Sequence, residues 1–587
     1  MTQDHPNPKP KKRAKRGESA LARNTARSTH GTLRSYSVGA LPLLNHVLQR
    51  MRLEEHLHAY LPDEDARTRP STPKALVILV RNLLLSREPL YGIGEWAARH
   101  APHLLGLSVA EVQRLNDDRM GRALDRLFLA DVPSLVLALA TRVVREFGVS
   151  VDELHNDSTT ITFSGAYAQA DGRRFLGQPT LCITWGHNKD HRPDLKQLLF
   201  LLTVTEDGGV PLHFRVADGN TTDVSTHRDT WEMLCRLAGR RDFLYVADCK
   251  LASSANMNYI AQHGGKFLTV LPRNRSEDKT FRQQLRQKQV TWEHLLDKTD
   301  ACGELLDQYS VCPQPAITSE GYRLLWYHSA SKAEHDAASR SRQIQRTLKR
   351  LEELRRKLLL PKTRYRQASK VRKAVAAILE ELDTEEWIRF QVLPKVTTTY
   401  HAEKPGRPNA STRFLRRHKT RFDLHCEVDL ARVAESGTGD GVFPLVTNVP
   451  ELSPGELLAV YKRQPVIEKR FSQLKTDFSV APVYLKEPRR IQALLCVYFF
   501  ALMAEALLER DLRRAMQREG IESLPMYPEG RPCHRPTTRR LLDLFEMVQR
   551  HEFTRRKGQP QVMTTDLSGL QRRLLRLLGL SDANYGR

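Results

Sequence analysis

The spacing of hydrophobic positions changes along this chain, and each change predicts a different kind of structure. Between residues 38 and 147 apolar side chains recur at the three- and four-residue spacing of an amphipathic helix. The clearest such segments are LPLLNHVLQRMRLEEHL (41–57), KALVILVRNLLLS (74–86) and RMGRALDRLFLA (119–130), separated by proline-containing breaks. The pattern predicts an all-α N-terminal domain.

From residue 149 the apolar residues come in short, β-branched and aromatic runs bounded by turn residues, which indicates strands. The predicted strands are SVDELHND (150–157), LCITWG (181–186), LLFLLTV (198–204), VPLHFRV (210–216), FLYVAD (243–248) and KFLTVLP (266–272), with helices at about 225–239 and 253–262. This order favours an α/β fold with a mixed sheet. Asp157 and Asp248 each end a predicted strand, and open α/β sheets usually place their sites at that edge.

Residues 275–450 interrupt this α/β pattern with a different one. A helical hairpin is predicted over about 333–385, broken at Pro361, because apolar residues line one face of each arm. Those residues are Ile344, Leu348, Leu351, Leu354 and Leu358 in the first arm and Val371, Val375, Ile378 and Leu382 in the second. The very basic segment 404–421 is expected to be a loop, either a phosphate-contacting arm or simply solvated.

The segment YKRQPVIEKRFSQLK (461–475) combines an apolar face with a carboxylate among cations. Ile467, Phe471, Leu474 and Phe478 share one helical face, so one helix is predicted through Tyr461–Lys475. Glu468 and Lys475 lie two turns apart and share an edge of that helix. An ordinary amphipathic helix with a solvated charged face is the alternative interpretation.

The charge balance indicates the kind of partner that the chain binds. Lys and Arg number 92 against 68 Asp and Glu, a net charge of +24. This favours a polyanion, most plausibly nucleic acid, over a membrane surface. Residues 1–35 are rich in Lys, Arg, Pro, Ser and Thr, which predicts a disordered basic tail. The most apolar run, 491–508, is interrupted by Gln492 and Glu505 and is expected to be a buried core helix, so no membrane span is predicted.

The cysteines and the N-terminus bear on the compartment. Eight cysteines are scattered without a CxxC pair, which indicates neither a zinc ribbon nor a disulfide framework. That usage fits a reducing cytoplasm. The basic N-terminus is followed by no apolar segment of a secretory signal. A cytoplasmic protein is therefore expected.

Three carboxylates stand out as candidate chemistry. Asp157, Asp248 and Glu468 are 91 and 220 positions apart, yet two strand ends and a helix could bring them together. Three carboxylates in one pocket repel one another unless a cation neutralises them. Hard oxygen ligands suit Mg²⁺, and a pair of such ions supports in-line phosphoryl displacement. An aspartate at a strand end is also a common turn former, which is the alternative for the first two.

Four motifs resemble a known family. They are HNDSTTITFSG (155–165), GHNKDHRPDLKQL (186–198), YVADCKLAS (245–253) and Y-x-R-x4-E-x6-K (461–475). Together they resemble a bacterial insertion-sequence transposase of the DDE type, in the group with a Tyr-Arg-Glu-Lys signature. The resemblance extends to GALPLLNHVL (39–48) and to the C-terminal region, so it covers nearly the whole chain.

The resemblance implies a fold and a division of the chain. The fold class is multidomain α/β, with a ribonuclease H-like mixed-sheet core that is split by a large α+β insertion and preceded by the all-α N-terminal domain. The implied parts are the basic tail (1–35), a helical DNA-binding domain (36–148), the first part of the core (149–274), the insertion (275–450), the second part of the core with Glu468 (451–515) and a basic helical C-terminal region (516–587). For residues 36–148, a domain that only packs is the alternative.

The resemblance also implies site residues and partners. Asp157, Asp248 and Glu468 would be the catalytic triad and would bind divalent metal, with two Mg²⁺ ions expected and Mn²⁺ as a substitute. The implied DNA-binding residues are Tyr461, Arg463, Lys475, Lys189 and Arg192. The loop that holds the last two could equally be a turn stabilised by its own aspartates. The expected partners are double-stranded DNA, as terminal inverted repeats and target, and a second copy of the chain in a synaptic complex near the nucleoid.

One departure from the family pattern concerns the signature arginine. The position four residues before Glu468 holds Gln464, and Arg463 is displaced by one residue. One helical position rotates a side chain by about 100°. Pro465 follows, and a helix can restart there because proline is tolerated in a first turn. A catalytically inactive DNA-binding derivative and a related nuclease without strand transfer are the alternative functions.

Overall fold

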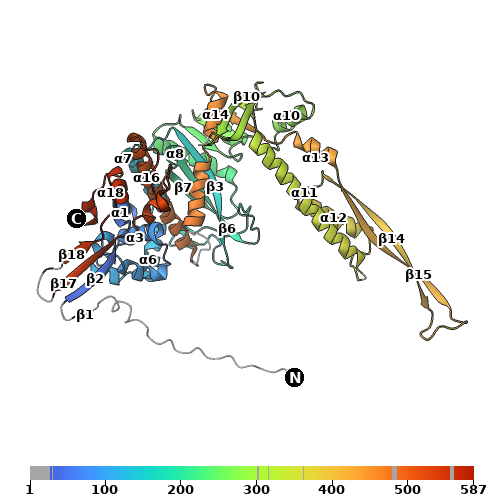
Figure 1. Cartoon of the computed structure of the whole chain (residues 1–587), viewed down its shortest axis with the longest axis horizontal. Coiled ribbons are helices and arrows are strands. Elements are labelled where there is room, and N and C mark those ends of the chain that lie inside the picture. Colours follow the sequence, from blue (N-terminus) through green and yellow to red (C-terminus); the bar gives the residue numbers. More distant parts are fainter. Residues whose placement is uncertain are drawn as a thin grey trace. The chain divides into compact units, whose positions relative to one another are not determined.

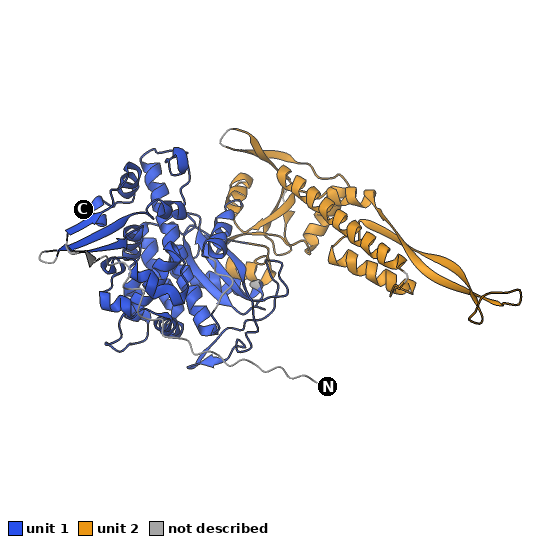
Figure 2. Ribbon diagram, turned by 60° about the horizontal axis from the view of Figure 1, so that its bottom comes forward, with its two compact units in different colours: residues 1–247, 262–266, 462–587 blue, residues 248–261, 267–461 orange. Residues whose placement is uncertain are grey.

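The computed structural model describes residues 27–586 except 29–30, 301–302, 315, 361, 479–484, 556–558 and 560. These residues form two compact units (Figure 2). Unit 1 contains the chain up to Ala247, Gln262–Lys266 and the chain from Lys462 onward, and unit 2 contains Asp248–Ala261 and Phe267–Tyr461. Most of the predicted basic tail lies outside the described residues. The strand β2 (Gly31–Ser37) occupies the end of it.

Unit 1 begins with the predicted helices. They are α1 (Leu41–Met51), α2 (Leu53–Tyr60), α3 (Thr72–Leu85), α4 (Ile93–Ala98), α5 (Val109–Gln113), α6 (Asp117–Leu129) and α7 (Val132–Phe147). Three of them, α1, α3 and α6, pack against α16 (Pro488–Arg518). The N-terminal helices therefore share a core with a helix from the other end of the chain.

The helix α16 is the buried centre of unit 1 (Figure 1). Its length and hydropathy satisfy the criteria for a membrane span, but 89% of its most apolar stretch is buried inside the protein. The bent pair α6–α7 satisfies the same criteria when it is taken as one broken span. Burial of α16 agrees with the sequence prediction of a core helix.

The sheet of unit 1 has the strand order β7-β6-β3-β8. The strands are β3 (Glu153–Phe163), β6 (Lys196–Thr205), β7 (Pro211–Ala217) and β8 (Leu244–Ala247). β3 pairs antiparallel with β6, β6 pairs antiparallel with β7, and β3 pairs parallel with β8. The helix α8 (His227–Ala238) connects β7 to β8, because parallel neighbours need a crossover. The predicted mixed α/β sheet is confirmed.

Two strand predictions in this region are wrong. Residues 181–186 form only isolated bridges, at Cys182 and Thr184, because the backbone there bonds to side chains and turns, as when Cys182 N–H donates to Asp218. Asp157 does not end its strand, because β3 continues to Phe163 in antiparallel register with β6. Only the parallel pairing with β8 stops at Asn156. The small hairpin β4 (Arg174–Phe175) and β5 (Gln178–Pro179) lies between β3 and β6 in the sequence.

Unit 2 has its own strands, in the order β10-β11-β13-β16-β9 with β12 beside β13. The strands are β9 (Lys266–Val270), β10 (Glu293–Thr299), β11 (Leu305–Val311), β12 (Ala316–Ile317), β13 (Arg323–Ser329) and β16 (Val442–Thr447). The shorter helices are α9 (Ser254–Gln262), α10 (Ser276–Arg286), α13 (Leu430–Gly437) and α14 (Pro454–Tyr461).

The predicted helical hairpin is confirmed as α11 (Ala330–Leu359) and α12 (Ala368–Glu381). Their apolar stripes meet in one cluster that includes Leu351, Leu354, Leu358, Val371 and Val375. The base of a long antiparallel ribbon, β14 (Ile388–Ala402) and β15 (Phe414–Val428), packs in the same cluster. The loop prediction for residues 404–421 is therefore wrong from Phe414 onward, because threonine-rich β14 supplies a full partner strand.

The C-terminal region is helical only in part. The predicted helix at 539–553 is wrong beyond Asp543, because α17 (Thr538–Asp543) is followed by the strand β17 (Gln549–Arg555). β17 lies between β2 and β18 (Gln561–Thr564), and β1 (Arg27–Ser28) completes this sheet. The pairing with β2, far away in the sequence, decides the conformation. The helix α18 (Gly569–Leu577) follows.

The helical hairpin generates a stability prediction from two neighbouring leucines. Leu358 is fully buried in the α11–α12 cluster, whereas Leu359 is 42% exposed. Leu358→Ala should lower the free energy of local opening of α12 by about 2–5 kcal/mol, the usual cost of emptying a packed leucine site. Leu359→Ala should change it by less than about 0.5 kcal/mol. Amide hydrogen exchange of the full chain measures both, and equal effects of the two substitutions would contradict this packing.

Candidate functional site

Asp157 lies at the middle of β3, half-buried and beside a cation. The ammonium of Lys189 lies 3.4 Å from Asp157 Oδ1. Lys189 Nζ also donates to Ser158 O and to Ser158 Oγ, each at 2.7 Å. Two protein acceptors thus aim this ammonium at the Asp157 carboxylate, and the position already favours positive charge.

Lys189 belongs to a tight loop of polar residues, 188–194, which is called the polar loop below. Asn188 Oδ1 accepts hydrogen bonds from the backbone N–H groups of Asp190 at 2.8 Å and Arg192 at 3.2 Å. Arg192 in turn donates through Nε and Nη2 to the two oxygens of Asp194, at 2.8 and 2.7 Å. Asn188 and Asp194 stabilise the turn, which agrees with the alternative interpretation for Asp194 but not for Asp190, and Arg192 is engaged within it.

The same loop reaches the last residue of the signature. Lys475 lies in a π-helical turn, Gln473–Asp477, and its Nζ donates to Asp190 Oδ1 at 2.6 Å. Asp190 and Lys189 are neighbours in the sequence. The loop therefore connects the carboxylate of Asp157 on one side to the signature cation Lys475 on the other.

The signature segment itself is broken rather than continuous. α14 ends at Tyr461, and α15 (Pro465–Ser472) begins after three intervening residues, with proline in its first turn. The prediction of one helix from Tyr461 to Lys475 is wrong, and the restart at Pro465 is confirmed. The expected apolar face is buried in the described residues Ile467, Phe471, Leu474 and Phe478.

The helix α15 packs against β3 and β6 and so lies against the strand that carries Asp157. Glu468 points from it into solvent and forms no ion pair with any residue that the structure describes. Both carboxylates belong to unit 1. Within that unit, Glu468 is an accessible carboxylate on a helix packed against the strand of Asp157.

Arg463, in the break between the two helices, forms a bidentate ion pair. Its Nε lies 2.8 Å from Glu153 Oε1 and its Nη2 lies 2.5 Å from Glu153 Oε2. His155 Nε2 lies 2.7 Å from the same Oε1. Burial opposes ionisation of Glu153, but the hydrogen bonds with His155 and Arg463 outweigh it and hold its pKa below the ordinary value. Arg463 thus ties the signature segment to the start of β3.

Tyr461, the first signature residue, is the last residue of α14 and of unit 2. Its ring stacks on Phe443 of β16, with centroids 5.8 Å apart and planes inclined by 29°. The chain therefore passes from one unit to the other between Tyr461 and Lys462. The two halves of the signature belong to different units.

A buried ionic cluster behind α15 was missed by sequence reasoning. Glu509 of α16 is 1% exposed and pairs with Lys469, with Arg513 at 2.6 Å and with Arg470 at 3.1 Å. Arg470 Nη1 also donates to Gln473 Oε1 at 2.7 Å, and Gln473 Nε2 donates to Glu505 Oε1 at 2.9 Å. The signal in the sequence was a pair of carboxylates, Glu505 within the apolar run of α16 and Glu509 directly after it.

Arg470 also fixes α15 to the turn between β6 and β7. Its Nε donates to Gly209 O and its Nη2 donates to Gly208 O, each at 2.8 Å. Gly209 has a φ of +62°, and a Cβ atom there would collide with Val466 of α15. A glycine is required at this position because both the left-handed backbone and the close approach of the helix exclude a side chain.

Asp248 follows β8 directly, as predicted, and is the first residue of unit 2. Its Oδ1 accepts from the backbone N–H of Lys250 at 3.0 Å. Its carbonyl oxygen accepts from Thr269 Oγ1 at 2.7 Å. Within unit 2, Asp248 therefore caps the turn after β8 and is tied to β9.

The described residues contain no preformed cluster of three or more His, Cys, Asp or Glu side chains around a metal position. The donor set nevertheless suits a hard cation, since the candidates are all carboxylates, and the Lys189 ammonium already stands beside one of them. The seven cysteines in the described part of the chain form no disulfide with one another.

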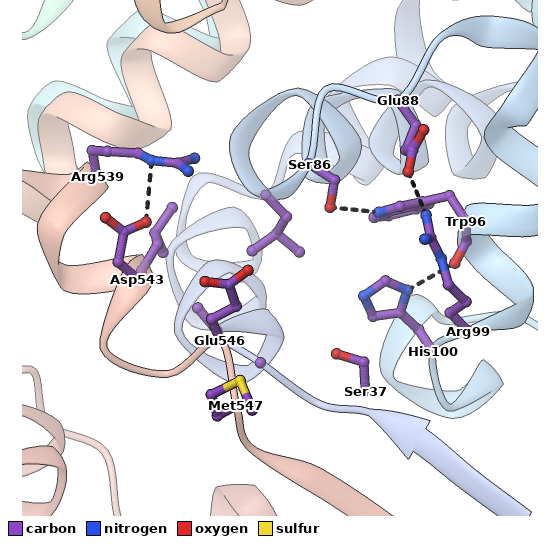
Figure 3. Close-up of a pocket in the computed structure, with 14 residues that line it drawn as sticks. Ser37, Ser86, Glu88, Trp96, Arg99, His100, Arg539, Asp543, Glu546 and Met547 are labelled. Atoms are coloured by element: carbon purple, nitrogen blue, oxygen red, sulfur yellow. Dashed lines mark hydrogen bonds and ion pairs between the residues drawn. The ribbon is translucent and has the colours of Figure 1, made fainter.

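A cavity of about 330 Å³ lies elsewhere in unit 1 (Figure 3). Its charged residues are largely paired with one another: Arg539 with Asp543 at 3.1 Å, and Arg99 with Glu88 at 2.5 Å. Trp96 Nε1 donates to Ser86 Oγ on its wall at 2.9 Å. None of the three candidate carboxylates lines this cavity, so it is separate from the candidate chemistry.

Three comparisons with known proteins bear on this chain. The family model described as "Transposase DDE domain" matches residues 154–504, and a "Domain of unknown function (DUF4277)" matches residues 33–141. The search of curated proteins found no match. A cryo-EM structure of a piggyBac transposase synaptic complex with hairpin DNA is similar at 9% identity, with 86% of this chain and 78% of that chain covered and a TM-score of 0.35. The first match spans all three candidate carboxylates.

The buried cluster generates a pH-dependent prediction. Burial raises the pKa of Glu505 from the ordinary 4.5 to about 7, with Arg470 opposing the shift and Glu509 adding to it. Because the pKa of Glu505 is raised in the folded state, its protonation contributes to the free energy of unfolding. This contribution is fully present below pH 4.5 and is lost as the pH rises through 7. The loss amounts to about 3 kcal/mol.

Urea unfolding of the full chain between pH 5 and pH 8 tests this shift. The Glu505→Gln variant, which carries no titrating group at this position, should lose less stability than the unsubstituted protein over this range. Glu519→Gln, at the exposed end of α16, is the matched control and should follow the unsubstituted protein. Parallel profiles for Glu505→Gln and the unsubstituted protein would show that Glu505 does not titrate in this window.

Proposed function

The chain belongs to the transposase DDE domain family and is a DNA transposase, and from this premise we propose that Asp157, Asp248 and Glu468 form its catalytic site. The family is one of polynucleotidyl transferases that generally use divalent metal ions. The proposal assigns to this chain the metal-dependent cutting of its element's ends and their joining to target DNA. The observation that carries it is the placement of an accessible Glu468 on a helix packed against the strand of Asp157.

The strand order of unit 1 supports a ribonuclease H-like core. The central β3 has an antiparallel neighbour, β6, on one side and a parallel neighbour, β8, on the other. The chain then leaves unit 1 for unit 2 and returns at Lys462, a few residues before Glu468. An insertion between the second aspartate and the glutamate is what the sequence resemblance implied.

The register of β3 and β8 supports the inclusion of Asp248. The last parallel pair is Asn156 with Ala247. Asp157 and Asp248 are each the residue after this pair, so both stand where the parallel pairing of β3 with β8 stops. We propose that Asp248 completes the set from this position.

A divalent cation bound by these carboxylates would activate the attacking oxygen and stabilise the leaving oxygen of a DNA phosphodiester. Mg²⁺ is proposed because carboxylates and water are its preferred ligands, with Mn²⁺ as a substitute. The carboxylates themselves bind and orient the cation. Lys189, which neutralises Asp157 in the structure, would shift to the substrate phosphate when a metal takes its place.

The polar loop and the signature cation would hold the DNA. Lys475 pairs with Asp190, and Lys189, the neighbour of Asp190 in the sequence, pairs with Asp157. Both lysine side chains are partly exposed, at 28% and 30%. As point charges they suit phosphate oxygens, which carry no sequence information. The proposed partners are terminal inverted repeats and target DNA, held by two copies of the chain near the nucleoid.

Arg463 is proposed to have a structural role rather than a catalytic one. Because Arg463 donates to Glu153 through Nε and Nη2, we propose that it fixes the signature segment on β3. That role does not require the register of the usual signature arginine. The altered register is therefore compatible with an active enzyme.

Asp157→Asn, Asp248→Asn and Glu468→Gln should each lower metal-dependent cleavage of end DNA by about 10³-fold or more, because each removes a charged metal ligand worth several kcal/mol. The assay is cleavage of a duplex that carries the element's terminal repeat, with binding of the same duplex measured in EDTA. Binding should change little, since the three substitutions remove negative rather than positive charge.

Asp229→Asn is the matched control, because Asp229 is an exposed carboxylate of α8 that pairs with Arg215. It should leave cleavage unchanged. Joining of pre-nicked ends to target DNA separates a transposase from a nuclease without strand transfer. Full cleavage by any of the three carboxylate variants would overturn the assignment of that residue.

A further inference from the structure

The ribbon β14–β15 carries a charge pattern that the proposed catalytic site does not use. Its register is regular from Ile388 opposite Val428 to Ala402 opposite Phe414. Directly opposite residues of an antiparallel pair point to the same side, so the register assigns every side chain to one of two faces. The ribbon extends beyond the α11–α12 hairpin of unit 2 (Figure 1).

The base of the ribbon has a structural role. On the face with even-numbered residues, Phe390, Val392, Phe422 and Leu424 pack against the apolar cluster of α11 and α12. From Lys395 on β14 to Thr420 on β15, around the turn, nearly all residues are exposed. The helices therefore hold the base, and the outer part is presented to solvent.

The outer part of the ribbon is strongly basic. From Pro394 to Phe422 it has eight Lys and Arg residues and a single carboxylate, Glu403. The odd-numbered face carries four of these cations, Lys395, Arg417, Lys419 and Arg421. The even-numbered face carries Arg416 beside Tyr400, with Val396 and Phe414 also exposed.

Two of these cations oppose each other directly. Lys395 pairs across the ribbon with Arg421, and Lys419 and Arg417 follow at the next two odd-numbered positions of the same strand. Like charges in opposite positions destabilise a strand pair. Nearer the base of the ribbon, Asp423 is bound by Arg355 and Asp429 by Arg389. Such a row of cations is stabilised by a polyanion.

We propose that the odd-numbered face of the outer ribbon, through Lys395, Arg417, Lys419 and Arg421, binds the phosphate backbone of duplex DNA. Two-stranded ribbons fit the major groove of B-DNA, and a row of cations along a strand matches a phosphate backbone. The inference rests on the proposed function for the identity of the polyanion. It adds a DNA contact made by unit 2, separate from the catalytic carboxylates.

The test is binding of the full chain to an unrelated duplex of about two helical turns, in EDTA, at several salt concentrations. Each cation that loses a phosphate contact should lower the slope of log K against log salt by about 0.9. When Lys395, Arg417, Lys419 and Arg421 are all changed to Gln, the slope should therefore fall by up to about 3.6. Its affinity should fall at least tenfold at low salt.

The register supplies a matched control of adjacent residues. Arg417→Gln should lower the slope by about 0.9, whereas Arg416→Gln removes the same charge from the other face and should leave the slope unchanged. A second control changes four exposed cations at α12 to Gln: Arg366, Lys370, Arg372 and Lys373. It should keep the slope as well, because Lys370, Arg372 and Lys373 lie on the helix, Arg366 lies just before it, and none of them lies on the ribbon.

Arg421 also donates to Leu359 O at 3.4 Å, so its loss can loosen the ribbon. The pair Arg417→Gln and Lys419→Gln avoids that contact and should lose about half of the full effect. Equal slopes for Arg416→Gln and Arg417→Gln, or an unchanged slope in the quadruple variant, would overturn the proposal. So would tighter binding to phosphatidylserine vesicles than to duplex.

Failure of this inference is distinguishable from failure of the proposed function. If the full chain binds no duplex at all, the proposed function is wrong. If it binds and cleaves DNA but the ribbon variants keep the salt slope, only the ribbon proposal is wrong. Asp157→Asn serves as the reference, since it should abolish cleavage and keep the slope.

Discussion

The structure of the candidate site depends on one buried carboxylate, Glu509. It lies on the core helix α16, almost inaccessible, with three cations around it. An isolated charge there would cost several kcal/mol, and removing one partner of a buried pair typically costs about 3–5 kcal/mol. Lys469 and Arg470 of α15 are therefore bound to α16. Since these two residues directly follow Glu468, the ionic cluster fixes the place of the proposed third metal ligand.

Further contacts fix the signature segment to the sheet of unit 1. Arg470 binds the two glycine carbonyls at the turn between β6 and β7, and Arg463 binds Glu153 at the start of β3. On the solvent side, the polar loop joins Asp157 to Lys475 through Lys189 and Asp190. The helix of Glu468 is thus held against the strand of Asp157 by hydrogen bonds and ion pairs. Rigid support of this kind is what a metal site needs for its ligands.

The sequence predicted those features whose cause is local. The helices of residues 41–147, the α11–α12 hairpin and the α/β order after residue 149 follow from hydrophobic periodicity, and their existence is confirmed. The three candidate carboxylates were found through motifs, and the restart of the helix at Pro465 through the chemistry of proline.

The errors arose where distant partners decide the structure. Nothing in residues 549–553 shows that β2, some five hundred positions earlier, pairs with them and makes a strand of a helical pattern. The break after Tyr461 coincides with the passage between the two units, which no periodicity reveals. The cations around Glu509 looked like solvated charges, because their burial depends on packing between α15 and α16. The sequence alone also did not show which cations of the ribbon share a face, because that depends on the register of β14 and β15.

We propose that Asp157, Asp248 and Glu468 hold the same metal ions, and the number of bound ions tests this directly. Electron paramagnetic resonance of Mn²⁺ counts the ions bound by the full chain on end DNA, without any requirement for turnover. About two ions per chain are expected for the unsubstituted protein. Fewer bound ions are expected after substitution of Asp157, Asp248 or Glu468 by its amide, and no change for Asp229→Asn. An unchanged Mn²⁺ count in any of the three carboxylate variants would contradict the proposed metal site.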